Sequence, residues 1–281
     1  MLLYKYFNAG LGERVLRSNK LRFTPPSEFN DLFEFRPRYQ NFNEASVLKE
    51  SMTKEHLQKE IDAQTDKIFD GAPTIRAVYE KANEGFDASS FGLDFVKQIF
   101  DVLSDKVPDI FYEQLNKAGV LCLTELPNQP VMWGSYGDNH HGIVLGFDSE
   151  NEFFDRRKSE KDDLRHLVKV DYYAEAPVIQ ILEDGEMPKV VSQKPDAWSH
   201  EREWRIIQAL QDADEIVEAE PPIHLFEFPP SCLREVILGH RVSKETENMV
   251  HEVLSDPAFA HVQIKRIEPD LNTNSLSVVN E

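Results

Sequence analysis

The sequence predicts an α+β fold with one hydrophobic core, and two features of its residue pattern carry this prediction. Strand-like runs of apolar residues lie on both sides of a block with helical spacing, and several successive strand-like runs have no helix between them. A doubly wound sheet would alternate strands with helices instead. We therefore expect a mixed or antiparallel split sheet that carries a mainly helical insertion.

The N-terminal region predicts two short strands with a helix between them. Strand patterns cover Leu2 to Phe7 and Leu21 to Thr24, and apolar residues recur at helical spacing within Leu11 to Ser18. The pair Pro25-Pro26 then ends the second strand.

From residue 41 to 118 the chain is rich in Glu, Lys, Gln, Asp and Ala with helix-like apolar spacing, which predicts the helical insertion. A further helix is expected over Lys244 to Leu254, and residues 269–281 are expected to be a polar, frayed tail after a single domain that spans residues 1–268. Further strands are expected at Val120 to Thr124, Gly142 to Phe147, Leu167 to Tyr173, Glu203 to Ile207, Glu235 to Leu238 and Val262 to Ile267.

Composition limits where the protein acts and what it binds. The 281 residues contain no apolar run long enough to span a membrane and no signal peptide, so we expect a cytoplasmic protein without a membrane partner. The two cysteines, Cys122 and Cys232, lie in apolar stretches and are expected to be buried hydrophobes.

Net charge argues against broad binding to a nucleic-acid backbone. The chain carries −19 overall, but residues 1–40 carry +3 against −22 for the remainder. A cationic region on an acidic protein can attract a small anionic ligand such as a nucleotide, although chance clustering on a solvated surface explains it equally well.

Two loop segments combine aromatic and polar residues. In Phe29 to Glu34, Asn30 and Asp31 are ordinary turn formers, but with Glu34 they could also face a ligand. The segment Met132 to Gly142 has groups that stack, hydrogen-bond or let the backbone approach a ligand. Its adjacent histidines at 140 and 141 would point to opposite faces of a strand, so we expect no metal there.

The segment Trp198 to Ile207 carries the strongest chemical signal. If it is extended, Glu201, Glu203 and Arg205 share one face, with successive Cα atoms about 6.6 Å apart. Paired carboxylates can bind a sugar hydroxyl and stabilise positive charge at an anomeric carbon. The same spacing also suits a plain Glu and Arg ladder on an exposed strand, which contributes little.

A series of motifs extends over residues 2 to 240. It comprises Leu3-Tyr4-Lys5-Tyr6, Leu21-Arg22-Phe23-Thr24, Phe29-Asn30-Asp31, Phe33-Glu34, Cys122-Leu123-Thr124, Met132-Trp133, Tyr136, His141-Gly142, Phe147, Val170, Tyr172, Lys194, Trp198, Glu201, Glu203-Trp204-Arg205 and Glu235 to Gly239. Together these motifs resemble the bacterial family known as domain of unknown function 2971. Leu32 stands where that family usually carries proline, which loosens the loop but removes no chemical group.

The motif layout also resembles the ADP-ribosyltransferase superfamily, whose last strand bears Glu-x-Glu. This resemblance implies NAD as co-substrate, no metal, and an unidentified macromolecular acceptor, as in a toxin or phage-defence effector, or a plain NAD glycohydrolase. It implies that Glu203 binds the nicotinamide-ribose 2′-hydroxyl and stabilises an oxocarbenium-like transition state, while Glu201 orients or deprotonates the acceptor. Tyr136 or Trp133 would stack on nicotinamide, and Lys5 or Arg22 would meet the pyrophosphate. The full set of expected substrate- or cofactor-binding residues is Tyr4, Lys5, Arg22, Asn30, Asp31, Glu34, Trp133, Tyr136, His141, Trp198 and Arg205.

Two other classes of function stay open at this point. Asp31, Glu34, Glu201 and Glu203 could act as oxygen ligands for Mg²⁺ in a nucleic-acid hydrolase, although the acidic surface counts against this reading. Alternatively, the aromatic blocks could bind a nucleotide or partner without turnover.

Overall fold

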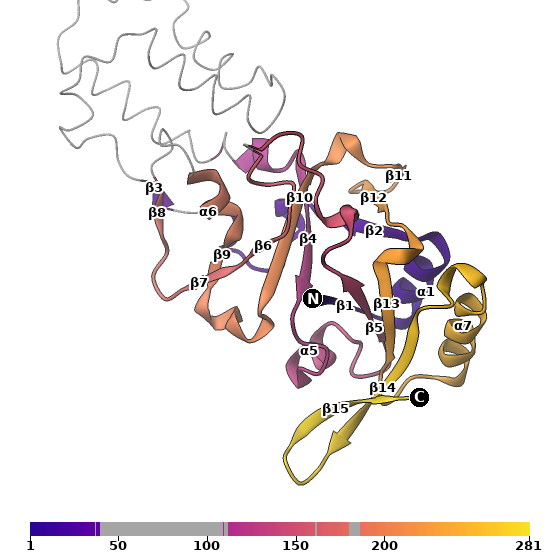
Figure 1. Cartoon of the computed structure of the whole chain (residues 1–281). Coiled ribbons are helices and arrows are strands. Elements are labelled where there is room, and N and C mark those ends of the chain that lie inside the picture. The colour runs from indigo at the N-terminus through magenta and orange to yellow at the C-terminus, as the bar shows by residue number, and fades with distance from the viewer. Residues whose placement is uncertain (37, 40–108, 110–111, 161, 180–185) are drawn as a thin grey trace, which may run out of the picture.

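The computed structural model describes residues 1–36, 38 and 39, 109, 112–160, 162–179 and 186–281. These residues form one large sheet together with the helices and smaller sheets around it (Figure 1). The insertion predicted at residues 41–118 lies almost wholly outside the described residues. Its helical character therefore stays a prediction.

The strands are β1 (Leu2–Phe7), β2 (Lys20–Phe23), β3 (Arg38–Tyr39), β4 (Ala118–Thr124), β5 (Ile143–Asp148), β6 (Val168–Lys169), β7 (Asp171–Tyr173), β8 (Val178–Ile179), β9 (Gln193–Pro195), β10 (Glu203–Ala209), β11 (Glu215–Val217), β12 (Ile223–Glu227), β13 (Leu233–Leu238), β14 (Gln263–Asp270) and β15 (Ser275–Asn280). The α-helices are α1 (Ala9–Ser18), α5 (Pro130–Ser135), α6 (Glu186–Ser192) and α7 (Lys244–Leu254). Short 3₁₀ helices are η1 (Pro26–Glu28), η3 (Glu152–Phe154), η4 (Asp196–Glu201), η5 (Leu210–Asp212), η6 (Pro230–Cys232) and η7 (Pro257–Phe259).

The central sheet has eight strands in the order β15-β14-β13-β5-β1-β4-β10-β6. Only β13 and β14 pair in parallel within it, so the sheet is mixed. Smaller sheets are formed by β11-β12-β2, by β3 and β8, and by β7 and β9. The predicted α+β class is confirmed.

Strand β1 shows how the two faces of the sheet are filled. Leu3 and Phe7 pack into the larger core, whereas Tyr4 and Tyr6 pack into a second core on the opposite face. Helices α1 and α7 contact each other and contribute buried residues to the larger core, as Figure 1 shows at the right of the sheet.

The first helix follows the capping rules. The Asn8 side chain accepts a hydrogen bond from the backbone N–H of Leu11 at 2.8 Å, and Asn19 ends the helix in the left-handed conformation at φ 54°. Helix α7 has the bounds that the sequence predicted, and the side chain of Ser243 caps it.

Two predictions about strands were wrong. The run Leu167 to Tyr173 is not one strand, because β6 pairs with β10 and β7 pairs with β9, and the chain changes sheets at Val170. The end of the chain is not a frayed tail, because β15 pairs with β14 along six residues and Leu276 is buried in the second core.

Within the described part of the chain, no helix is long and apolar enough to cross a membrane.

Candidate functional site

The pairing of β10 with β4 fixes which side chains of the third block share a face. Arg205 lies opposite Cys122, and Glu203 lies opposite Thr124. Trp204 and Ile206 point to the other face and pack with the larger core, as the alternation predicted. Glu203 and Arg205 therefore share one face of the sheet.

Glu201 lies beside Glu203, but not, as the sequence predicted, as a residue of the same strand. It does not continue the strand, because it ends the 3₁₀ helix η4, and Arg202 then turns the chain with a left-handed φ of 43°. The Thr124 hydroxyl donates to the Glu201 carbonyl at 2.5 Å and holds this turn against β4.

Lys194 joins the carboxylates of three separate segments. Its Nζ lies 2.7 Å from Oε2 of Glu201, 2.9 Å from Oε2 of Glu203 and 3.5 Å from Oε1 of Glu34. The ammonium also lies 4.9 Å from the ring centroid of Trp198, a cation–π contact.

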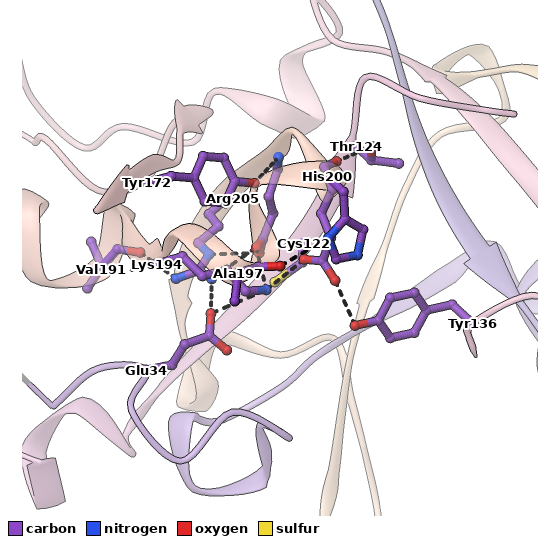
Figure 2. Close-up of polar contacts among 12 residues, drawn as sticks. Glu34, Cys122, Thr124, Tyr136, Tyr172, Val191, Lys194, Ala197, His200 and Arg205 are labelled. Carbon is purple, nitrogen blue, oxygen red and sulfur yellow. Dashed lines mark hydrogen bonds and ion pairs between the residues drawn. The ribbon is translucent and has the colours of Figure 1, made fainter. Parts of the chain in front are cut away.

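Arg205 completes this set of charges. Its Nε and Nη2 donate to the two carboxylate oxygens of Glu203 at 2.7 and 3.0 Å, Nη1 donates to the Val191 carbonyl at 2.9 Å, and Nη2 also donates to Glu34. We call Glu34, Lys194, Glu201, Glu203 and Arg205 the ionic network. Figure 2 shows Glu34, Lys194 and Arg205 meeting at its centre.

The ionic network is buried, which rules out the reading of a plain surface ladder. Each of its five side chains is no more than 6% exposed. Buried charges are tolerated only when they are paired and hydrogen-bonded. The network therefore depends on all of its members.

Burial and the neighbouring charges have opposite effects on the pKa values of the ionic network. Burial disfavours the charged form of Glu203, but Arg205 and Lys194 outweigh it and lower its pKa to about 2. Burial raises the pKa of Glu34 in spite of Arg205 and Lys194. Burial also disfavours charged Lys194, yet the three carboxylates raise its pKa. Glu203 and Lys194 consequently stay charged at neutral pH.

A cavity of about 340 Å³ borders this network. Strand β1 pairs with β4 only at Thr124, and Thr24 next bridges β4 at Val120, so the edge of β4 is open between them. The side chain of Lys5 fills part of this opening and donates to the Cys122 carbonyl at 3.0 Å. The cavity is lined by Tyr4, Lys5, Tyr6, Thr24, Glu28, Phe29, Asn30, Val120, Cys122, Leu123, Thr124, Met132, Tyr136, Lys194, Glu201 and Glu203.

Tyr136 connects the cavity to the ionic network. Its hydroxyl donates to Oε1 of Glu201 at 2.8 Å, and it approaches from a different side than Glu34 (Figure 2). Burial and the nearby Glu201 raise the pKa of this hydroxyl, so it stays a proton donor in the hydrogen bond. Both oxygens of Glu201 are thus fixed, one by Tyr136 and one by Lys194.

Most of the residues expected in the site gather there. Six of them line the cavity, and Glu34 and Arg205 lie directly behind it in the network. The six are Tyr4, Lys5, Asn30, Tyr136, Glu201 and Glu203.

Five expected binding residues serve other contacts. Arg22 is paired with Glu28 at 2.5 Å, and Asp31 accepts from the backbone N–H of Phe33 at 2.9 Å as a turn residue. Trp133 is fully buried against Tyr6, His141 lies in an exposed turn beside the Asp138 carbonyl, and Trp198 covers Lys194. None of the five lines the cavity, so their assignment as ligand contacts stays a prediction.

Lys194 and Glu28 were missed as site residues. Lys194 belongs to the family pattern, but a lysine seven residues before Glu201 has no spacing that predicts contact in a strand or helix. Glu28 precedes the predicted loop by one residue, and only the cavity reveals its position.

The fold and the site together define an α+β protein with a buried ionic network beside a cavity. The family model described as protein of unknown function (DUF2971) matches residues 132–206, a segment that contains Tyr136, Lys194 and both site carboxylates of β10 and η4. The resemblance to this family is confirmed. Comparisons with curated proteins and with solved structures found no match.

Proposed function

We propose that the cavity binds an NAD-like nucleotide and that the protein breaks its bond to nicotinamide, as an ADP-ribosyltransferase-like enzyme or an NAD glycohydrolase. One observation carries this proposal: Glu201 and Glu203 line the same cavity, and a tyrosine hydroxyl and a lysine fix the first of them. Paired carboxylates beside a sugar are the usual means of stabilising an oxocarbenium-like transition state.

The two carboxylates suit different tasks. Glu203, with a pKa of about 2, stays ionised and can stabilise positive charge at the anomeric carbon without taking a proton. Glu201 is held without an arginine and can orient the acceptor and receive its proton. In this reaction the bond to nicotinamide breaks, nicotinamide leaves with the bonding pair, and an acceptor or water oxygen bonds to the anomeric carbon.

The contacts of the network favour this chemistry over a Mg²⁺-dependent hydrolase. Lys194 and Arg205 already bind the carboxylates of Glu34, Glu201 and Glu203, so a metal would have to share these three carboxylates with two cations. Asp31, the fourth expected ligand, holds its own loop instead. NAD consumption would suit a bacterial toxin or phage-defence effector, and that role forms part of the proposal.

The test measures nicotinamide release from NAD by the purified protein, with and without cell extract. We expect Glu201→Gln to lower release at least 100-fold, while Glu150→Gln, a change at a carboxylate that is 85% exposed, leaves it unchanged. Greater turnover with extract would indicate transfer to an acceptor, and equal turnover would indicate hydrolysis.

Three results would contradict the proposal. Full activity in Glu201→Gln would remove the assigned site. Cleavage of DNA or RNA that a chelator abolishes would favour the metal-dependent hydrolase. NAD binding by a folded protein without release of nicotinamide would favour a binding module.

A further inference from the structure

The cavity has a second polar wall that the proposed chemistry does not use. It is formed by Lys5 on β1 and Glu28 on η1, and neither residue belongs to the ionic network. Arg22 interacts with both residues: it forms an ion pair with Glu28, and its positive charge lowers the pKa of Lys5.

Lys5 is a cation without a carboxylate partner. In the part of the chain that the structure describes it forms no ion pair, whereas the other lysine on the cavity wall, Lys194, contacts three carboxylates. Its one hydrogen bond goes to the Cys122 carbonyl, and an ammonium has three donors. Burial disfavours the ammonium charge of Lys5 and lowers its pKa, and the charges of Glu203 and Glu201 only partly oppose this effect. An anionic group of a ligand would compensate it.

Glu28 offers a free hydrogen-bond acceptor at the same cavity. Its Oε2 is paired with Arg22, while its Oε1 is buried and, among the described residues, has no hydrogen-bond partner. A buried carboxylate oxygen without a hydrogen-bond donor is unfavourable. A ligand hydroxyl can supply the missing donor.

The size of the cavity limits what it can hold. At about 340 Å³ it lies at the lower end of the range for small-molecule sites, so of an NAD-like dinucleotide it suits the nicotinamide mononucleotide half, with the adenosine half outside the cavity.

We propose that Lys5 and Glu28 form a subsite for a phosphorylated ribose, in which Lys5 binds the 5′-phosphate and Oε1 of Glu28 accepts a hydrogen bond from a sugar hydroxyl. The proposal rests on the proposed function only for placing the glycosidic bond at Glu201. It assigns the phosphate to Lys5 alone, because Arg22 is held by Glu28.

The experiment compares two ligands that differ only in the phosphate. They are the carbocyclic analogue of nicotinamide mononucleotide, in which the ring oxygen needed for an oxocarbenium ion is absent, and its dephosphorylated form. Calorimetry on the full chain should show the phosphorylated analogue binding about 10- to 100-fold more tightly. Lys5→Met should abolish this difference, and Lys5→Arg should keep it. Lys20→Met is the matched control, since Lys20 is paired with Glu215 and does not line the cavity.

Glu28→Gln should weaken both ligands by the same factor, because both carry the sugar hydroxyls. Equal affinity of the wild type for the two analogues, or a phosphate preference that survives in Lys5→Met, would overturn the subsite. A Lys5-dependent preference in a protein that releases no nicotinamide from NAD would uphold the subsite and remove the glycosidic chemistry, so the two failures are distinguishable.

Discussion

The carboxylate of Glu34 accepts a hydrogen bond from the guanidinium of Arg205, which lies 171 residues further along the chain. Both side chains are almost fully buried. The contact joins the loop after η1 to strand β10. The same loop contributes Asn30 to the cavity wall, so the ion pair between Glu34 and Arg205 anchors this part of the cavity.

Arg205→Met should destabilise the protein by about 3–5 kcal/mol, because Glu34 and Glu203 would lose one of their two cationic partners while still buried. Urea unfolding measures this change. Arg17→Met is the control, since its pairs with Glu13 and Glu252 are about half exposed and should be worth less than about 1 kcal/mol. Equal effects of the two substitutions would contradict the assigned role of Arg205.

Acid should weaken the fold through Glu203. Its folded pKa of about 2 lies below the ordinary value of 4.5, so the unfolded chain binds the proton more readily. The stability that Glu203 contributes is complete above the unfolded pKa and is lost as the pH falls toward 2. The free energy of unfolding, measured against pH, should therefore fall less steeply in Glu203→Gln than in the wild type. Glu34→Gln should not flatten this acid limb, because burial raises the pKa of Glu34.

Tyr136→Phe should lower the turnover number for nicotinamide release by about 10-fold or more, since it removes the hydrogen bond that positions the Glu201 side chain. The ring stays in place, and the free energy of unfolding should change by less than about 2 kcal/mol because Tyr136 is 36% exposed. Steady-state kinetics and chemical unfolding on the same preparation separate the two effects. Unchanged turnover would show that the hydroxyl does not position Glu201 for the reaction.

Two leucines of the C-terminal hairpin test whether β15 belongs to the fold. Leu276 is 9% exposed and packs in the second core, so Leu276→Ala should cost about 2–4 kcal/mol. Leu271→Ala removes the same atoms from a side chain that is 85% exposed and should cost less than about 0.5 kcal/mol. A small effect at both positions would mean that the end of the chain is a tail, as its polar composition suggested.

The elements with a strong internal pattern could be predicted from the sequence. Strands β1 and β4 are short, nearly continuous apolar runs, and helix α7 carries apolar residues at helical spacing, so each shows a pattern that is independent of the rest of the chain. Strand β15 could not be predicted in this way, because Ser275 and Ser277 on its outward face are polar and its stability comes from pairing with β14 and from one buried leucine. The break at Val170 also depends on partners, since β6 and β7 pair with different strands.

The site could be predicted in part for a similar reason. The alternation of β10 places Glu203 and Arg205 on one face from sequence alone. Glu201 was expected to share that face as part of the strand, yet it arrives there through a left-handed turn at Arg202. The ion pairs of Lys194 and the free oxygen of Glu28 depend on contacts between distant segments, which no local spacing records.

The position of β1 between β4 and β5 has a consequence for the order in which the protein can fold. Strand β1 lies in the middle of the sheet, and its two neighbours follow it by more than a hundred residues along the chain. Glu34 therefore stays a solvated charge on the growing chain until its partner Arg205 on β10 has been made. Since the pairings that close the sheet are so distant in sequence, we expect slow folding in which the cavity forms last.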